Sequence, residues 1–395
     1  MSAVIISPKR LSHWVLIPIV AILLLLGGCD LPRVSATDRL FIDLSLEFLS
    51  EYQLPKQEFK GTQVGGLSGI TYDRQRNRFY AISDDRSEFA PARFYTLSLN
   101  LDQTNPKKPK IQDVTVEAIA TLTDEKGQPY PKATVDPEGI ALSPLGTFFI
   151  SSEGVARQGI APFIREFDRT NGAWIRSLSI PDRYLPVLKD GAIVKGVQDN
   201  LGFEALTLSL SGYSGASVEP FRLFTATESA LVQDRNPTST QGAISRLLHF
   251  LVEPGKALLV SEHAYALEPL PEGAMQTGLT ELLALDQAGH FLSLERSFGP
   301  AGFQVKLFQI STGGATDTST IDSLQGNPSG VQLIRKQLVL DLNQLGIRLD
   351  NLEGMTFGPR LADGSQSLIL ISDDNFNSNQ MTQLLLFRVL SPLSI

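Results

Sequence analysis

Acidic residues recur at two fixed places along this sequence. One place is the start of a short apolar run, and the other is the end of the apolar run that follows it. The first set comprises Glu138, Glu204, Glu281 and Glu353, with Ser68 at the matching place of the first segment. The second set comprises Asp84, Asp85, Glu153, Glu228, Glu295, Asp373 and Asp374. Because one short pattern carries all of them, we expect these side chains to meet at a single site.

Carboxylates gathered in this way cannot all stay ionised without compensation. Two unit charges about 4 Å apart repel by about 4 kcal/mol at an effective dielectric constant of 20. The cluster must therefore bind cations, pair with arginines or raise its pKa values. Arg86, Arg157 and Arg296 lie close to the acids in sequence and could neutralise several of them. A glutamate at a strand start could also act as a fastener that accepts backbone N–H bonds. We favour a cation or substrate site for the whole set and leave the role of each single acid open.

The donors near these acids predict a hard metal ion. Hydroxyl groups accompany them at Ser68, Ser83, Ser152 and Ser372. The histidines beyond residue 29 are His249, His263 and His290, which are scattered and show no metal-ligand spacing. Ca²⁺ takes six to eight oxygen ligands, so this set fits calcium better than zinc or copper. All acids of both sets are predicted metal ligands, and no catalytic residue is predicted.

The elements that carry the acids repeat. Five segments that begin near residues 66, 136, 202, 279 and 351 each read as strand, turn and strand with alternating apolar positions. Two further strand-like runs follow each pair, except in the last unit, which has one. The apolar run 39–46 can supply the missing strand and close a ring. Repeated four-stranded units predict an all-β fold, a β-propeller of five blades closed by an N-terminal strand. A sixth blade within 299–338 and a pair of β-sandwiches are the alternatives.

The propeller plan brings the two acidic sets together. The first strand of each blade lines the central channel, and the second runs antiparallel beside it. The start of one and the end of the other therefore lie at the same mouth of the channel. We expect a ring of carboxylates there.

The same stretches resemble a known family. They are Gly65-Gly-Leu-Ser-Gly-Ile with Ser83-Asp-Asp-Arg, Asp136-Pro-Glu-Gly-Ile-Ala, Gly202-Phe-Glu-Ala-Leu, Leu279-Thr-Glu-Leu-Leu-Ala-Leu with Leu294-Glu-Arg, and Asn351-Leu-Glu-Gly-Met-Thr-Phe with Ser372-Asp-Asp-Asn-Phe. In order and over roughly residues 60–390, the chain resembles the phytase-like family described as "esterase-like activity of phytase". The resemblance implies a secreted propeller related to calcium-dependent phosphate-ester hydrolases, in which bound Ca²⁺ neutralises substrate phosphate and activates water. The chain lacks the Asp-Asp-Pro-Ala motif of the true propeller phytases and shows no Lys/Arg cluster for a polyanion, which argues against phytate itself.

Two functions follow as hypotheses. One is a calcium-dependent hydrolase of phosphate or other esters that acts on a small molecule at the acidic mouth. The other is a non-catalytic propeller that binds a ligand or partner and uses calcium structurally. The sequence contains no Gly-x-Ser-x-Gly elbow, Walker A motif or dinucleotide fingerprint.

The N-terminus predicts export and a lipid anchor. Lys9 and Arg10 precede an apolar run, and Leu26-Gly-Gly-Cys29 resembles the bacterial lipobox. We expect a signal peptide over 1–28, a tether over 29–37 that begins at lipidated Cys29, and one propeller domain over 38–395. Without residues 1–28 the formal charge changes from −8 to −10, which argues against nucleic acid and against electrostatic contact with anionic lipid. The expected protein is a monomer in the cell envelope, at the outer face of the cytoplasmic membrane or in the periplasm, that reaches the membrane through its lipid only.

Overall fold

Strands account for nearly all regular structure in the computed structural model of this chain. The structure describes residues 40–209, 219–236, 241–326 and 328–391. The signal peptide, Cys29 and the tether predicted over 1–37 lie outside these ranges. Four short 3-10 helices are the only helices in the described part: η1 (Ala156–Gln158), η2 (Asp182–Tyr184), η3 (Val232–Asp234) and η4 (Leu342–Leu345).

Five four-stranded antiparallel sheets carry the described unit that starts at Phe41. Blade 1 holds β4 (Leu67–Asp73), β5 (Arg78–Ser83), β6 (Arg93–Asp102) and β7 (Lys110–Thr121). Blade 2 holds β8 (Pro137–Leu142), β9 (Thr147–Ser152), β10 (Phe163–Asp168) and β11 (Trp174–Ser177). Blade 3 holds β14 (Phe203–Leu208), β15 (Phe221–Thr227), β16 (Ile244–Glu253) and β17 (Lys256–Ala266). Blade 4 holds β18 (Gln276–Ala284), β19 (His290–Gly299), β20 (Gly302–Ser311) and β21 (Arg335–Asp341).

Blade 5 joins the two ends of the described chain. It holds β22 (Asn351–Arg360), β23 (Gln366–Asp373) and β24 (Thr382–Leu390), and its outer strand is β1 (Ser45–Leu54). The predicted closure by an N-terminal strand is therefore confirmed, although the strand lies later than the predicted run 39–46. Polar residues alternate with apolar ones through Leu54, as befits an edge strand with one face in water. This alternation hides the strand from a search for a continuous apolar run.

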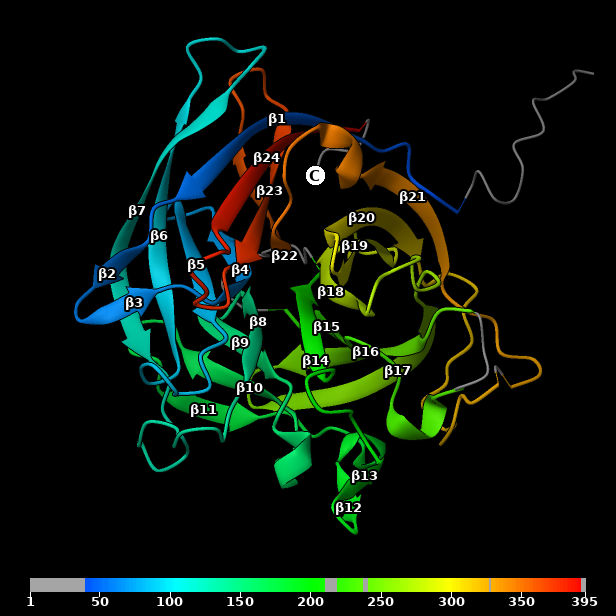
Figure 1. The fold of residues 1–395 in the computed structure, drawn as a ribbon. Helices are drawn as coiled ribbons and strands as arrows, with labels where there is room; N and C mark the ends of the chain where they lie inside the picture. The colour runs from blue at the N-terminus through cyan, green and yellow to red at the C-terminus, as the bar shows by residue number, and fades with distance from the viewer. Residues whose placement is uncertain (1–39, 210–218, 237–240, 327, 392–395) are drawn as a thin grey trace, which may run out of the picture. The chain divides into compact units, whose positions relative to one another are not determined.

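The blades form a closed ring (Figure 1). Each inner strand contacts the next, in the order β4, β8, β14, β18, β22 and back to β4. The buried apolar side chains fall into five clusters, and each cluster fills the interface between two neighbouring blades. Because neighbouring blades cover both faces of each sheet, the inner strands are buried along most of their length, whereas outer strands such as β7 and β17 alternate between exposed and more buried residues. This arrangement confirms the five-bladed propeller and excludes the pair of β-sandwiches.

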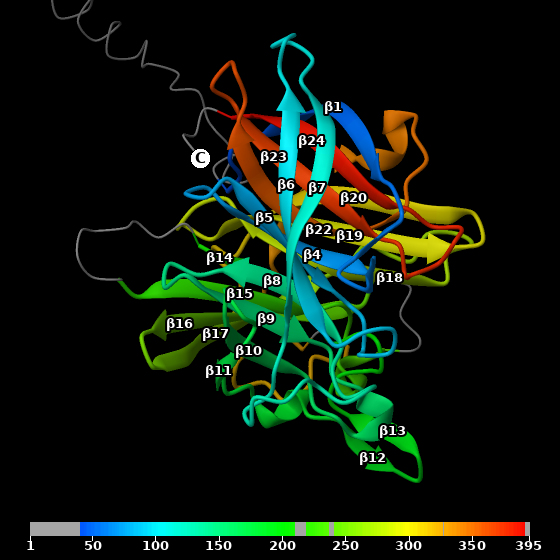
Figure 2. The same cartoon turned by 90° about the vertical axis from the view of Figure 1, so that its left-hand side faces the viewer.

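The long connection in blade 4 does not form a sixth blade. Between β20 and β21 the described residues contain no strand, and the connection lies along β17 instead. The N–H groups of Thr318 and Ile334 donate to the carbonyls of Glu262 and Ala264 in that strand. Two small hairpins stand outside the blades: β2 (Gln57–Phe59) with β3 (Thr62–Val64), and β12 (Val187–Lys189) with β13 (Ala192–Lys195). The second hairpin projects from the body in both views (Figures 1 and 2).

Candidate functional site

A bulge near the start of every inner strand determines which side chains reach the channel mouth. Just before each bulge, a residue of the inner strand pairs with one near the end of the second strand: Leu67 with Ser83, Pro137 with Ser152, Phe203 with Thr227, Leu279 with Glu295 and Leu352 with Ser372. The next residue on each strand occupies the ring. On the inner strands these residues are Ser68, Glu138, Glu204, Thr280 and Glu353, and on the second strands they are Asp84, Glu153, Glu228, Arg296 and Asp373.

In blade 4 this register corrects the sequence prediction by one residue. Thr280 and Arg296 hold the ring positions that were assigned to Glu281 and Glu295. A shift of one residue moves a side chain to the opposite face of a strand. Glu281 accordingly accepts the N–H groups of Leu206 (3.0 Å) and Leu282 (2.9 Å), as a fastener between blades 3 and 4. Glu295 accepts hydrogen bonds from the Tyr265 hydroxyl (2.6 Å) and the Lys336 ammonium (2.7 Å).

The second acid of each Asp-Asp pair also lies outside the ring. Asp85 forms a buried ion pair with Arg93 (2.7 Å) and accepts the N–H groups of Glu88, Phe89 and Ala90. Asp374 accepts the N–H groups of Gly66 (2.9 Å) and Phe376 (3.1 Å). Both carboxylates therefore hold loops at the mouth. Their neighbours Asp84 and Asp373 face the channel.

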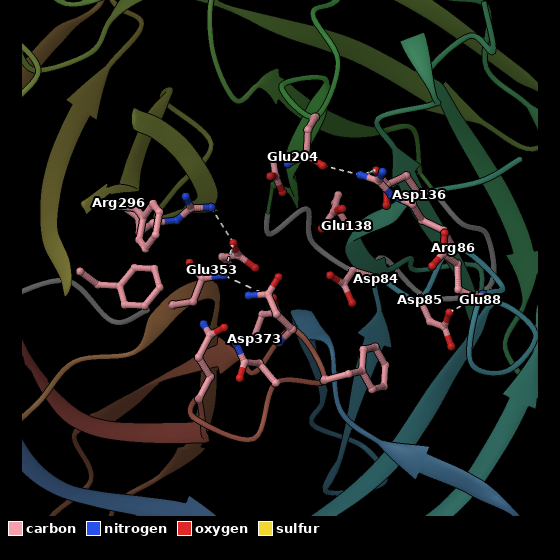
Figure 3. A pocket seen from close by; sticks show the side chains of 18 of the residues that line it. Asp84, Asp85, Arg86, Glu88, Asp136, Glu138, Glu204, Arg296, Glu353 and Asp373 are labelled. Carbon is pink, nitrogen blue, oxygen red and sulfur yellow. Dashed lines mark hydrogen bonds and ion pairs between the residues drawn. The ribbon is translucent and has the colours of Figure 1, made fainter. Parts of the chain in front are cut away.

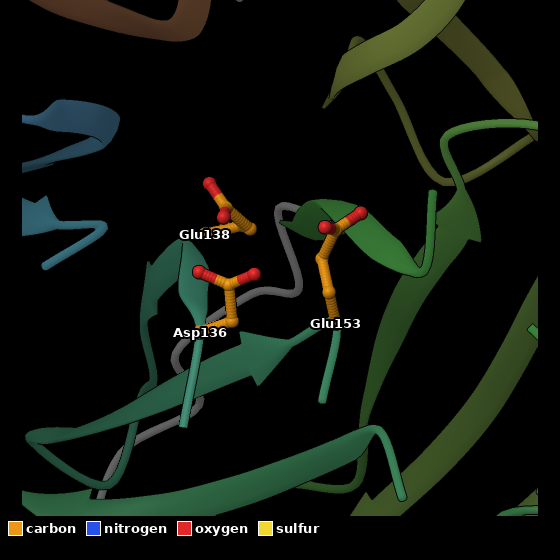
Figure 4. Close-up of side chains that lie close together, drawn as sticks. All are labelled: Asp136, Glu138 and Glu153. Atoms are coloured by element: carbon orange, nitrogen blue, oxygen red, sulfur yellow. The ribbon is translucent and has the colours of Figure 1, made fainter. Parts of the chain in front are cut away.

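Five of the ring acids line a cavity of about 640 Å³ at the channel mouth: Asp84, Glu138, Glu204, Glu353 and Asp373. Figure 3 shows Asp84, Glu138 and Glu204 from blades 1, 2 and 3 directed toward a common space, together with Glu353 and Asp373 from blade 5. Two groups of three carboxylates are each compact enough to bind one cation. The ligand oxygens of Asp136, Glu138 and Glu153 lie within 4.8 Å of one another, as do those of Glu153, Glu204 and Glu228 (Figure 4 shows the first group). Glu153 belongs to both groups, so the two positions are adjacent.

Two arginines compensate part of this charge. Arg86 pairs with Asp136 at 2.5 Å, and Arg296 pairs with Glu353 at 2.6 Å and with Glu228 at 3.5 Å. Arg157, the third arginine considered from the sequence, instead pairs with the surface residue Asp199. The remaining ring carboxylates, Asp84, Glu138, Glu153, Glu204 and Asp373, have no ion pair with an arginine or lysine within the described residues.

Burial and mutual repulsion raise the pKa of the ring acids. For Asp84, Glu138, Glu153, Glu204 and Asp373, loss of solvent and then the neighbouring carboxylates raise the pKa well above its ordinary value. Burial also raises the pKa of Asp136 to about 6 and that of Glu228 to about 7, although the paired arginine lowers each. Because the pKa values are raised, a cation that binds these carboxylates must compete with protons.

Besides Oδ2 of Asp136, which is ion-paired with Arg86, two buried oxygens of cavity-lining residues lack a hydrogen-bond partner. They are Oδ1 of Asp84 and Oδ1 of Asn351, and both residues line the cavity. The amide of Asn351 donates to Glu353 (2.8 Å) and Asp373 (3.3 Å), which leaves its oxygen free to act as a ligand. Because buried polar atoms are almost always satisfied, these orphans indicate a missing ligand. A donor set made only of oxygens fits a hard cation such as Ca²⁺ or Mg²⁺.

Comparison with known families agrees with this geometry. Residues 62–376 match the model of the phytase-like family, whose description is "Esterase-like activity of phytase". The chain belongs to this family. All ring residues of the phytase-like chain, from Ser68 to Asp373, fall within the matched range.

Other comparisons of the phytase-like chain add no argument about its function. No curated protein matches it. The solved structure of an endo-arabinase from Bacteroides thetaiotaomicron shares 9% identity at a TM-score of 0.42, and the match covers 84% of this chain and 95% of that chain. The N-terminal domain of Nup159 shares 12% identity at a TM-score of 0.35, with 88% of this chain and 96% of that chain covered. A likeness at this level does not extend to chemistry.

Asp136 and Asn351 are the site residues of the phytase-like chain that the sequence prediction missed. Each lies two residues before a ring glutamate, at the place where the other blades have Gly66, Gly202 and Gly278. A side chain at Gly278 would collide with the Glu228 carboxylate, which explains the glycine at this place. A polar residue there departs from the repeat, and this departure was the signal that could have identified Asp136 and Asn351. The serine hydroxyls that accompany the acids in sequence are engaged in hydrogen bonds with the backbone. Ser68, Ser83 and Ser372 donate to backbone carbonyls, and Ser152 accepts backbone N–H bonds.

Proposed function

We propose that this chain is a hydrolase of phosphate or other esters that depends on Ca²⁺ held at the channel mouth. The observation that carries the proposal is the buried, unpartnered Oδ1 of Asp84 beside two groups of closely spaced carboxylates. Asp136, Glu138, Glu153, Glu204 and Glu228 would hold calcium, with Asp84 and Asp373 across the same cavity. Bound calcium would supply charge for a substrate anion and lower the pKa of a bound water.

The chain's own residues position the calcium ligands and set their protonation. Arg296 lies between Glu353 and Glu228 and fixes two carboxylates that come from different blades. Without metal the pKa of Glu228 is raised to about 7, so this ligand gives up a proton when it binds calcium near neutral pH. The cavity has room for a small substrate, and its buried floor limits competing water.

The proposal is tested by activity with and without calcium. Purified protein is assayed on a phosphomonoester, a phosphodiester and a carboxyl ester, in millimolar calcium and in chelator. We expect turnover of at least one class in calcium only. Asp84→Asn and Glu153→Gln should weaken calcium binding by about tenfold or more, because each removes a charged ligand. Glu117→Gln is the matched control, because Glu117 pairs with Arg78 at the solvent-exposed side of blade 1 and does not line the cavity. Equal, near-zero rates on all three substrates in both conditions would overturn the proposal.

A non-catalytic propeller is the second candidate, and the arginine pairs favour it. Arg86 and Arg296 already tie Asp136, Glu228 and Glu353 together, as a structural plug would. In that case calcium raises the melting temperature but no ester is turned over. The same assay, run beside a thermal melt, separates the two functions.

We also propose that the protein is exported and anchored through a lipid on Cys29. Support comes from the lipobox-like Leu26-Gly-Gly-Cys29. None of the helices in the described part of the chain has the length and apolar character that a membrane crossing requires. Labelling with radioactive palmitate in a bacterial host should mark the wild type and leave Cys29→Ser unlabelled. Labelling of both proteins would contradict the anchor.

A further inference from the structure

Two pairs of aromatic rings lie at the acidic cavity. Phe89 and Phe376 have ring centroids 4.7 Å apart, and Phe298 and Phe303 have centroids 5.3 Å apart. All four side chains line the cavity that contains Asp84 and Glu353. Phe89 is 67% exposed and Phe298 is 41% exposed, which is unusual for phenylalanine. Exposed apolar groups gathered at a concave site indicate ligand contact.

The first pair is held in place by the Asp-Asp motifs. The N–H of Phe89 donates to Asp85 (3.1 Å), and that carboxylate is fixed by its buried ion pair with Arg93. The N–H of Phe376 donates to Asp374 (3.1 Å). In each motif, therefore, the first aspartate faces the channel and the second holds a loop that carries a phenylalanine. Acid and aromatic ring are positioned as one unit on blade 1 and again on blade 5.

The backbone at Phe376 is strained. Its φ is 52°, and that of the preceding Asn375 is 47°, so two consecutive residues adopt the left-handed conformation. For a bulky residue such as phenylalanine this conformation is a rare outlier, and strain of this kind concentrates at functional sites. Gly65 leaves room for the ring, because a Cβ there would lie 3.1 Å from a Phe376 ring carbon. The strained backbone at Asn375 and Phe376 thus places this ring at the cavity.

The charges around the cavity limit what can bind beside the rings. Among the described residues that line it, Arg86 and Arg296 are the only arginines or lysines, and both are paired with carboxylates. One anionic group can be accommodated at a bound cation. Further phosphates on the same molecule would face Asp84, Glu88 and Asp373 without compensation.

We propose that the cavity binds a monoester with one phosphate group whose organic part is an aromatic ring that lies against these phenylalanines. The proposal rests on the proposed function, because the phosphate would contact the cation held by the ring acids. Aromatic rings prefer offset or edge-on packing with centroids about 4.5–7 Å apart, and the two observed pairs offer such surfaces. The phenylalanine rings thereby favour a substrate with an aromatic organic part. The uncompensated carboxylates disfavour molecules that carry more than one phosphate.

Isothermal titration calorimetry in millimolar calcium tests this proposal with phenyl phosphate and methyl phosphate. Both ligands carry one phosphate, so their difference reports the ring alone. We expect phenyl phosphate to bind about tenfold more tightly, the effect of a well-placed aromatic contact. The double variant Phe89→Ala/Phe298→Ala should remove this difference and leave methyl phosphate binding unchanged. Both side chains are exposed, so the variant should fold normally. Leu258→Ala, an exposed position on β17 outside the cavity, is the control.

Each outcome separates this proposal from the proposed function. Equal affinity for the two ligands, or wild-type preference in the double variant, overturns the aromatic site and leaves the hydrolase standing. Tight binding of phenyl phosphate supports the aromatic site, and if near-zero rates on all three ester classes accompany it, the hydrolase is overturned while the aromatic site stands. Failure of both ligands to bind in calcium overturns the aromatic monoester site, and the assay on the three ester classes then decides the hydrolase separately.

Discussion

Glu204 and Glu281 are both buried near the start of an inner strand, yet their carboxylates have different surroundings. Glu204 shares a close group with Glu153 and Glu228, and repulsion from Glu153 and Glu228 adds to burial in raising its pKa. Glu281 faces backbone N–H groups instead, and burial alone raises its pKa to about 8. Glu204 is thus placed to bind a cation, whereas Glu281 connects blades 3 and 4 through its hydrogen bonds.

This difference predicts opposite effects of two substitutions. Glu281→Ala removes an acceptor from buried N–H groups, so it should lower the free energy of unfolding by about 1–3 kcal/mol. The shift of melting temperature on adding calcium should remain. Glu204→Gln should reduce that shift sharply and leave the melting temperature in chelator unchanged or higher, because it relieves repulsion. Thermal melts of both variants in calcium and in chelator provide the measurement. A lost calcium response in Glu281→Ala would show that the ring includes Glu281.

The sequence located most of the ring and failed where two chemical signals competed. Glu138, Glu204 and Glu353 follow the same pattern of strand start and bulge, so periodicity was enough to place them. In blade 4 the neighbouring acids drew the prediction away from the ring, to Glu281 one residue after Thr280 and to Glu295 one residue before Arg296. The pair Gly278-Leu279, which matches Gly202-Phe203, carried the correct register. The two roles within Asp84-Asp85 and within Asp373-Asp374 depend on loop conformation, which periodicity does not encode.

At the scale of elements, the ring depends on the strand that joins its two ends. β1 pairs with β24 from Ser45 opposite Leu390 to Leu54 opposite Thr382. Its side chains also pack into the clusters on both sides of blade 5, with Phe48 on one side and Tyr52 on the other. Without β1, an apolar edge would be exposed along β24. We therefore expect the stability of the propeller, and not only its closed topology, to depend on β1.

A deletion series tests this dependence. Removal of residues 1–54 should abolish the single cooperative melt and produce aggregation, because β24 loses its partner and two clusters are opened. Removal of residues 1–39 is the matched control, since it leaves β1 whole, and should melt like the untruncated protein. Size-exclusion chromatography and thermal melts report both properties. A soluble and equally stable 55–395 fragment would show that the ring holds without its closing strand.

At the scale of the whole molecule, the buried acids link stability to pH. In unfolded chains carboxyl pKa values lie near 4. In the folded protein without metal they are raised, to about 6 for Asp136, about 7 for Glu228 and about 8 for Glu281. The folded state then binds more protons than the unfolded state, so the stability from these groups is present below about pH 4 and is lost as pH rises through 6 to 8. His249 acts in the opposite direction. Burial lowers its pKa to about 4, so its contribution is lost as pH falls below about 6.5.

Calcium should reverse the dominant trend. In chelator, the melting temperature should be higher near pH 6 than at pH 8, because several acids outweigh one histidine. Calcium binds the ionised carboxylates, so its stabilising effect should grow from pH 6 to pH 8. At a free calcium concentration of about a hundred times Kd, the gain is about 2.7 kcal/mol. Thermal melts at both pH values, with calcium and with chelator, give four melting temperatures. Their comparison shows whether calcium reverses the pH dependence of stability. A chelated protein that is more stable at pH 8 than at pH 6 would mean that the ring acids are already neutralised within the fold, and the cation would then have no charge to satisfy.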